Sequence, residues 1–232
     1  LQHDLAEQLY NNGFSEDKVK VNVNITPVTT TDPEVININY DSVLSLSIDG
    51  MDDNRYILPK VKVEVSGRSM SEPISDVLID SMIDQVYPKA PFAESKFKVR
   101  AVLPERTFLE KLFLLHEEFT NPKDLIRVER MSRHLYDIGQ MLKTPIAERA
   151  VNDADLYKQV LEHRRTFIGL RGFDYDTLHP ATLHIVPPSP VIEQWKTDYE
   201  NMRLHMIYGE SVPFEKLIEE LASLNAEINK LR

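Results

Sequence analysis

The stretch Pro104-Glu105-Arg106-Thr107-Phe108-Leu109-Glu110-Lys111-Leu112-Phe113-Leu114-Leu115-His116-Glu117-Glu118-Phe119 decides the fold, because the apolar periodicity of the chain changes there. Its apolar stripe recurs at helical spacing, at Phe108, Leu112, Leu115 and Phe119. Thr107 and Glu110 have the spacing of a capping box, which predicts the start of a helix that ends near Phe119. We therefore expect a domain boundary between residues 103 and 104.

Before this boundary, apolar and polar residues alternate with the period of two that is typical of half-buried strands. The clearest case is Val61-Lys62-Val63-Glu64-Val65, whose valines share one face while Lys62 and Glu64 share the other. Strands are predicted at 19–25, 35–39, 44–48, 61–65 and 97–101, a turn at 49–54, and helices at 1–12 and 75–86. Residues 1–103 are thus predicted to form an α+β domain with a mixed or antiparallel sheet.

After the boundary, helical periodicity dominates. Apolar residues at offsets of three and four predict a helix over about 122–142, with its stripe at Val128, Met131, Leu135, Ile138 and Leu142. Further helices are predicted at 154–167, 191–208 and 214–231. Residues 104–232 are therefore predicted to form an all-α domain.

The composition fits a soluble globular protein of one or two domains. The 232 residues include 27 Lys and Arg against 37 Asp and Glu, a net charge of −10, and 42% of them are hydrophobic. The sequence has no uncharged apolar run of about 18 residues, which argues against a transmembrane helix. The absence of Cys excludes disulfide scaffolds, thiolate zinc sites and a cysteine nucleophile. The acidic total argues against a general polyanion binder but not against a local basic patch.

Glu64 is a candidate metal-binding or base carboxylate. It lies in mid-strand on the face opposite the valines, where a sheet can present an oxygen ligand rigidly, as Mg²⁺ requires. One carboxylate does not make a two-metal site, so Glu64 would need partners. The alternative is a solvated side chain.

Two successive helices carry candidate anion-binding residues. Lys111 is either a surface lysine paired with Glu118 or a point charge set against the phosphates of a nucleotide at a domain cleft. The next helix has a polar face at offsets of 0, 3, 4 and 7, formed by Arg130, Arg133, His134 and Asp137. Such a face suits an anionic ligand, because guanidinium groups donate to phosphate in bidentate fashion. The alternative is a solvated helix face.

The stretch 104–119, followed by Glu129-Arg130-Met131-Ser132-Arg133-His134-Leu135-Tyr136-Asp137, resembles the AbiEii/AbiGii family of nucleotidyltransferase-like toxins from abortive-infection, type IV toxin–antitoxin systems. The family pattern is a T…EKL…L helix and then a helix with R-D/H-L-Y-D-L. Upstream, Lys62-Val63-Glu64-Val65-Ser66-Gly67-Arg68-Ser69 resembles its vkiEi…R strand, and Met206-Ile207-Tyr208-Gly209-Glu210 fits a subgroup. The resemblance spans about residues 56–232.

This resemblance implies a polymerase-β-like nucleotidyltransferase domain and then a helical domain, with a nucleoside triphosphate (NTP) and Mg²⁺ bound between them. Glu64 would be a catalytic, metal-binding carboxylate of the sheet, and Lys111 would contact phosphates. Arg133 and Asp137 would complete the nucleotide-binding and catalytic shell, which also includes Arg68, Arg130 and His134. The implied partners are an RNA (tRNA) or protein acceptor and a cognate antitoxin, in a cytoplasmic bacterial protein that does not associate with membranes.

The chain departs from the family at its first motif, a Gly-Ser or Gly-Gly-Thr-Ser turn followed by an Asp-x-Asp strand. The turn cradles phosphate through backbone N–H groups and the aspartates carry the metals, and neither element is present in this sequence. Because the chain opens on Leu1-Gln2-His3-Asp4 without Met or signal-peptide features, we expect it to begin within a longer protein whose preceding segment holds the motif. The alternatives are a catalytically inactive protein of the same fold that binds a nucleotide or a partner, and a purely structural protein.

Overall fold

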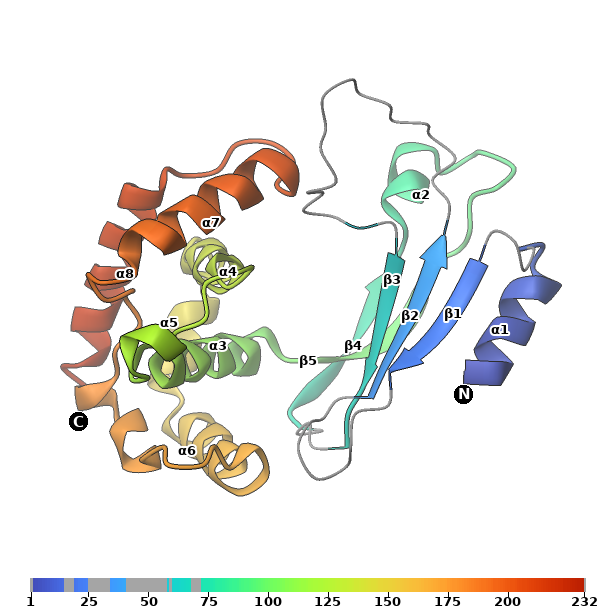
Figure 1. Ribbon diagram of the computed structural model, residues 1–232. Helices are drawn as coiled ribbons and strands as arrows, with labels where there is room; N and C mark the ends of the chain where they lie inside the picture. The colour runs from blue at the N-terminus through green and yellow to red at the C-terminus, as the bar shows by residue number, and fades with distance from the viewer. Residues whose placement is uncertain are drawn as a thin grey trace. The chain divides into compact units, whose positions relative to one another are not determined.

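The computed structural model describes residues 2–14, 19–24, 34–40, 58, 60–67 and 72–231. These residues form helices and two small antiparallel sheets, which is typical of the α+β class (Figure 1). The chain forms two compact units, one of Leu1–Ser69 with Asn201–Ser211 and one of Met70–Glu200 with Val212–Arg232. The boundary expected between residues 103 and 104 stays a prediction. No helix in the described part of the chain is long and apolar enough to cross a bilayer.

The first unit contains a helix and a three-stranded sheet. Helix α1 (Gln2–Asn11) precedes strands β1 (Val19–Asn24), β2 (Glu34–Tyr40) and β3 (Lys60–Val65), which pair antiparallel in the order β1-β2-β3. Ile36 of β2 is buried and lies opposite Val63 of β3, as the alternating pattern requires. The predicted helix at 1–12 and the strands at 19–25, 35–39 and 61–65 are confirmed. The predicted strand at 44–48 and the turn at 49–54 lie outside the described residues.

The second unit begins with an antiparallel hairpin of β4 (Ile74–Ile79) and β5 (Phe97–Val102), between which lies the short helix α2 (Met82–Val86). The strand predicted at 97–101 is confirmed, but the helix predicted at 75–86 is wrong in its first half. Val77 and Leu78 have helical spacing to Ile74, yet Val77 lies opposite Val99 in the hairpin, so the ladder decides the conformation.

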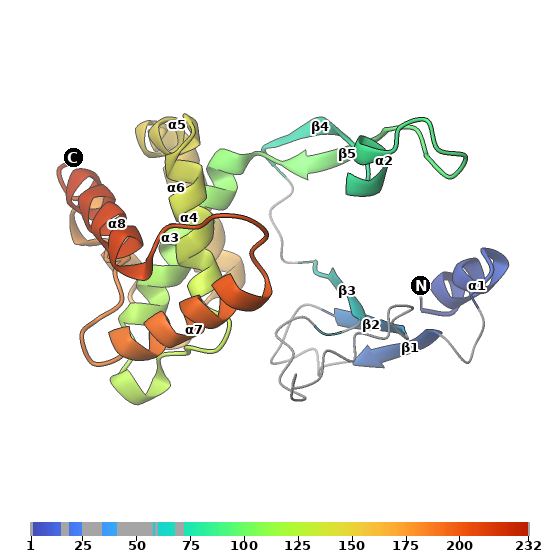
Figure 2. The same cartoon turned by 90° about the horizontal axis from the view of Figure 1, so that it is seen from above.

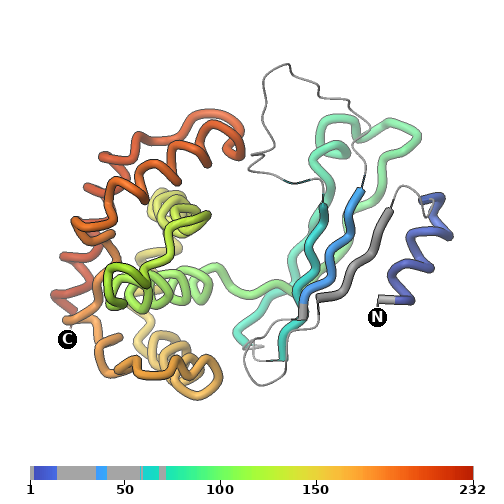
Figure 3. Tube along the Cα trace, in the orientation of Figure 1, coloured from blue at the N-terminus to red at the C-terminus, as the bar shows by residue number. Residues whose placement is uncertain are grey.

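Helix α3 (Pro104–Phe119) follows β5 after one residue. The Cα trace runs from the hairpin directly into this helix (Figure 3). Leu103 occupies the N-cap without a side-chain hydrogen bond, and Pro104 takes the first helical position, where its missing N–H costs nothing. The predicted capping box is therefore wrong, because Thr107 and Glu110 lie inside the helix. Arg106 is buried and donates to the Glu110 carboxylate at 2.9 Å and to the Glu72 carbonyl at 3.4 Å, which ties α3 to the base of the hairpin.

A bundle of helices packs around α3 (Figures 1 and 2). It comprises α4 (Ser132–Leu142), α5 (Ile146–Asn152), α6 (Ala154–His163), α8 (Phe214–Ile228) and the part of α7 (Ile192–His205) up to Glu200, because the residues of α7 from Asn201 on belong to the first unit. Helix α3 contacts α4, α5 and α6, and α4 also contacts α8. The largest fully buried side chains include Phe108, Phe113, Leu112, Leu135, Ile138 and Trp195. The helices predicted at 191–208 and 214–231 are confirmed, and the one at 154–167 ends at His163 and continues as the π-helical turn η2 (Arg164–Ile168).

Helix α4 begins ten residues later than predicted. A 3-10 turn, η1 (Lys123–Leu125), stands where the helix was expected to start, and Arg130 adopts a left-handed conformation with φ of 60°. At its other end α4 approaches α8 closely: a Cβ on Gly139 would lie 2.5 Å from the Leu217 Cδ1 atom. The absence of a side chain at Gly139 therefore sets how near these two helices lie.

Candidate functional site

The predicted site residues Lys111, His134 and Asp137 lie together where α3 meets α4. The Lys111 Nζ atom donates to Asp137 Oδ2 at 2.7 Å and lies 3.5 Å from His134 Nδ1. The Lys111 side chain is 18% exposed and that of Asp137 40%, so the ion pair borders solvent. The alternative pairing of Lys111 with Glu118 is wrong, because Glu118 binds Arg127 instead.

The imidazole of His134 is uncharged near neutral pH. Burial, followed by the neighbouring charges of Lys111 and Arg133, lowers the pKa of His134 to about 4 against the opposing effect of Asp137. Because the Lys111 ammonium faces Nδ1, we assign the proton to Nε2, which leaves Nδ1 as an acceptor. His134 therefore offers an N–H donor, and the positive charges of the cluster come from Lys111 and Arg133.

Arg130 does not belong to the helical face on which it was predicted. Because α4 starts at Ser132, only Arg133, His134 and Asp137 share that helix. Arg130 lies in the turn before it, where its backbone N–H donates to the Asp198 carboxylate at 2.7 Å. The periodicity placed Arg130 in the middle of a helix over about 122–142, whereas α4 begins two residues after Arg130.

Asp198 is a buried carboxylate that sequence analysis missed. It lies on α7 with 9% of its surface exposed, and it accepts hydrogen bonds from Arg130, just before α4, and from Ser132, the first residue of α4. The sequence signal was an acidic residue between Trp195 and Tyr199, two aromatic residues of the core. That position does not show burial, because Lys196 lies between the same two residues and its side chain is 42% exposed. Nor does it identify the partners of Asp198, of which Arg130 lies 68 residues earlier.

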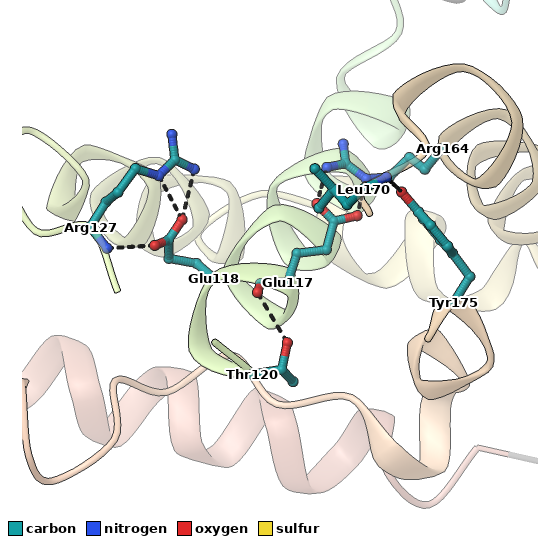
Figure 4. Close-up of polar contacts among 7 residues, drawn as sticks. All are labelled: Glu117, Glu118, Thr120, Arg127, Arg164, Leu170 and Tyr175. Carbon is teal, nitrogen blue, oxygen red and sulfur yellow. Dashed lines mark hydrogen bonds and ion pairs between the residues drawn. The ribbon is translucent and has the colours of Figure 1, made fainter. Parts of the chain in front are cut away.

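Two further buried carboxylates, Glu117 and Glu118 of α3, are held by arginines (Figure 4). Glu118 accepts from the Arg127 guanidinium at 2.9 and 2.7 Å and from the Arg127 backbone N–H at 2.5 Å. Glu117 accepts from Arg164 Nε at 2.8 Å and also pairs with Arg164 Nη2. These acids fasten α3 to the 127 segment and to η2, and their oxygens are occupied by guanidinium groups rather than open to a metal.

Close to these pairs, the Tyr175 hydroxyl accepts from the Leu170 backbone N–H at 2.9 Å, so the loop after η2 is held at a second point (Figure 4). Thr120 Oγ1 donates to the Glu117 carbonyl at 3.0 Å and satisfies one of the free carbonyls at the end of α3. The C-terminal half of α3 is therefore braced by polar contacts, while its N-terminal half carries Lys111.

Glu64 lies on β3 in the first unit, opposite Val35 of β2. Its half-exposed carboxylate forms an ion pair with Lys62 on the same face of the strand. The described residues contain no group of three His, Asp or Glu side chains that could hold a metal ion, so on their own they do not fit a magnesium site. The metal-binding role of Glu64 stays a prediction, and Arg68, also predicted to bind the nucleotide, lies outside the described residues.

Buried histidines make stability depend on pH. His116 is 2% exposed; its Nδ1 atom accepts from the His184 N–H at 2.9 Å and its Nε2 atom lies 3.1 Å from Thr177 Oγ1. Burial, and secondarily the charge on His184, lowers the pKa of His116 to about 4. An unfolded histidine binds its proton near pH 6.5, so the unfolded state holds more protons between about pH 6.5 and 4 and is favoured as the pH falls through this range.

We therefore expect the free energy of unfolding to fall as the pH is lowered from 7 to 5, with His116 contributing on the order of 2 kcal/mol. Urea titrations at pH 7 and 5 measure this change. The variant His116→Gln should show a smaller difference between the two values, whereas His205→Gln, at an exposed position, should behave as the wild type. An unaltered pH dependence in His116→Gln would contradict the assignment.

Comparison with known proteins identifies one family. The family model described as "Nucleotidyl transferase AbiEii toxin, Type IV TA system" matches residues 3–220. The match includes Lys111, His134, Asp137 and Asp198, and it begins well before residue 56, where the resemblance found in the sequence starts. No curated protein and no solved structure shows significant similarity to the chain.

Proposed function

The chain belongs to the AbiEii family of nucleotidyl transferase toxins of type IV toxin–antitoxin systems, and on this premise we propose that it transfers a nucleoside monophosphate from an NTP to a hydroxyl group of an RNA or protein. The acceptor oxygen forms a bond to the α-phosphorus while the bond from that phosphorus to the bridging oxygen breaks. Pyrophosphate leaves, and the acceptor proton passes to solvent or a base. The family match over residues 3–220 carries this proposal.

The cluster at α3 and α4 supports a role in binding the triphosphate. Lys111 and Arg133 supply positive charge, and the uncharged His134 supplies an N–H donor. Asp137 holds the Lys111 ammonium at the partly exposed edge of the cluster, so a phosphate oxygen reaching Lys111 would share or replace that contact. Charged hydrogen bonds of this kind stabilise negative charge that develops on the phosphates during transfer.

Mg²⁺ dependence is part of the proposal, with Glu64 as the metal-binding carboxylate, as the resemblance to the family implies. Since Glu64 is paired with Lys62 and the described residues supply no complete ligand set, we assign no step of the reaction to the metal. The family places the protein in a two-component system. A cognate antitoxin is accordingly the proposed protein partner.

A second candidate function is nucleotide or partner binding without transfer. The observation that favours it is the same incomplete set of metal ligands among the described residues. Both candidates require an NTP or partner to bind, and they differ in whether a covalent product forms.

The experiment that separates them uses the full-length protein with NTPs labelled at either the α- or the γ-phosphorus. We expect label from the α-position, and none from the γ-position, to become covalently attached to RNA or protein from a cell extract, and Glu64→Gln to reduce this attachment. Lys60→Gln, a change on the same strand outside the predicted site, serves as the control. Tight NTP binding without transfer of α-label would favour the second candidate, and transfer of γ-label would contradict both.

A further inference from the structure

A single buried carboxylate, that of Asp198, accepts hydrogen bonds from the backbone at the start of α4. Asp198 Oδ1 accepts from the Arg130 N–H at 2.7 Å, and Asp198 Oδ2 accepts from the Ser132 N–H at 3.0 Å and from Ser132 Oγ at 2.5 Å. Both carboxylate oxygens are therefore used, and all of the donors come from residues 130–132. The side chain is 9% exposed, so water does not compete freely for these donors.

Helix α4 has no cap of its own. The side chain of its N-cap residue, Met131, accepts no hydrogen bond from the first turn, and the first turn contains no acidic residue. The first N–H groups of any helix lack partners within the helix, and the positive end of its dipole favours a nearby anion. Asp198 supplies this anion from α7, far along the chain.

The backbone at this point is also in an unusual conformation. Arg130 is the non-glycine residue that has a positive φ, of 60°, among those described. Residues other than Gly, Asn and Asp adopt the left-handed region rarely, and such conformations persist where surrounding contacts fix them. The bond from the Arg130 N–H to Asp198 is one such contact.

The segment fixed in this way leads directly into the candidate site. Arg130 lies in the turn, Arg133 and His134 lie in the first turn of α4, and Asp137 one turn later pairs with Lys111 of α3. A shift or fraying of the start of α4 would move these groups relative to Lys111. The hydrogen bonds from residues 130–132 to Asp198 are thus the contacts through which α7 sets the geometry of the cluster.

We propose that Asp198 is a positioning residue of the nucleotide site, acting by holding the start of α4 so that Arg133, His134 and Asp137 are aligned with Lys111. This rests on the proposed function, in which that cluster binds the triphosphate. Asp198 acts through the backbone of residues 130–132.

The test compares NTP binding by the full-length protein with that of three variants. Asp198→Asn keeps the shape but puts an NH₂ group against donors, Ser132→Ala removes one of the hydrogen bonds, and Asp153→Asn makes the same chemical change at the N-cap of α6, where Asp153 accepts from the Leu156 N–H. We expect Asp198→Asn to weaken NTP binding at least about fivefold and Ser132→Ala by less, in line with the loss of one or more hydrogen bonds. Asp153→Asn should bind like the wild type.

A second measurement does not depend on nucleotide. Amide hydrogen exchange at residues 130–137 should become faster in Asp198→Asn and stay unchanged in Asp153→Asn. Faster exchange with undiminished NTP binding would overturn the positioning role and leave Asp198 a structural cap, and unchanged exchange would overturn the anchoring itself. If the wild type binds no NTP although exchange responds as expected, the proposed function fails while Asp198 is still shown to hold α4.

Discussion

Lys111→Ala is expected to lower the rate of nucleotidyl transfer by about 100-fold or more, the usual scale for losing one charged donor aimed at developing negative charge. The ammonium lies 2.7 Å from Asp137 at the partly exposed edge of the α3–α4 contact, where a phosphate oxygen can reach it. Its removal takes away the positive charge that lies nearest to Asp137 and His134. Stability should change little, because the Asp137 side chain is 40% exposed and can be solvated.

Initial rates measured over a range of NTP concentrations separate kcat from KM for this variant. Lys143→Ala is the matched control, because Lys143 is exposed just after α4 and donates to Gln140 at 3.1 Å, away from the cluster. Lys111→Arg keeps the charge but changes the donor geometry, so it should retain part of the activity. If Lys111→Ala transferred nucleotide at the wild-type rate, Lys111 would not be a residue of the site.

The largest effect on stability is expected for Arg164→Ala, which should lower the free energy of unfolding by about 3–5 kcal/mol. The side chains of Arg164 and Glu117 are 12% and 6% exposed, so removal of the guanidinium leaves a buried carboxylate without its ionic partner. The same change also detaches η2 from α3 (Figure 4).

Urea unfolding of Arg164→Ala beside Arg165→Ala measures this effect with an internal control. Arg165 forms its ion pair with Asp176 at 2.7 Å, but those side chains are 43% and 83% exposed, so its loss should cost less than about 1 kcal/mol. The double variant Glu117→Leu/Arg164→Leu should recover much of the lost stability, because it leaves no buried charge. Equal losses of unfolding free energy in Arg164→Ala and Arg165→Ala would show that burial does not make the first ion pair more important than the second.

Periodicity predicted those elements whose local pattern agrees with their tertiary contacts. The alternation at 61–65 became β3, and the stripe from Phe108 to Phe119 became the buried face of α3. It failed at Ile74–Ile79, where three apolar residues imitate a helix while the partner strand lies some twenty residues ahead. It also missed α5, which is too short for periodicity to be read and begins directly after Pro145.

In the candidate site too, sequence spacing identified some residues and missed others. Lys111, His134 and Asp137 could be selected because each lies on a regular helix, where sequence spacing fixes direction. Asp198, Glu117 and Glu118 could not, because their partners are set by how the chain folds back and not by local spacing. Buried acids in a sequence become interpretable only when the donors that surround them are known.

The anchoring of α4 from α7 also has a consequence for protein synthesis. Asp198 follows Arg130 by 68 residues, so a nascent chain on the ribosome contains Lys111, Arg133 and Asp137 well before it contains the acceptor that fixes their helix. A product that terminates early, before α7, keeps those three side chains but has no Asp198 to bind the backbone at residues 130–132. Full alignment of the cluster thus waits until α7 has been synthesised.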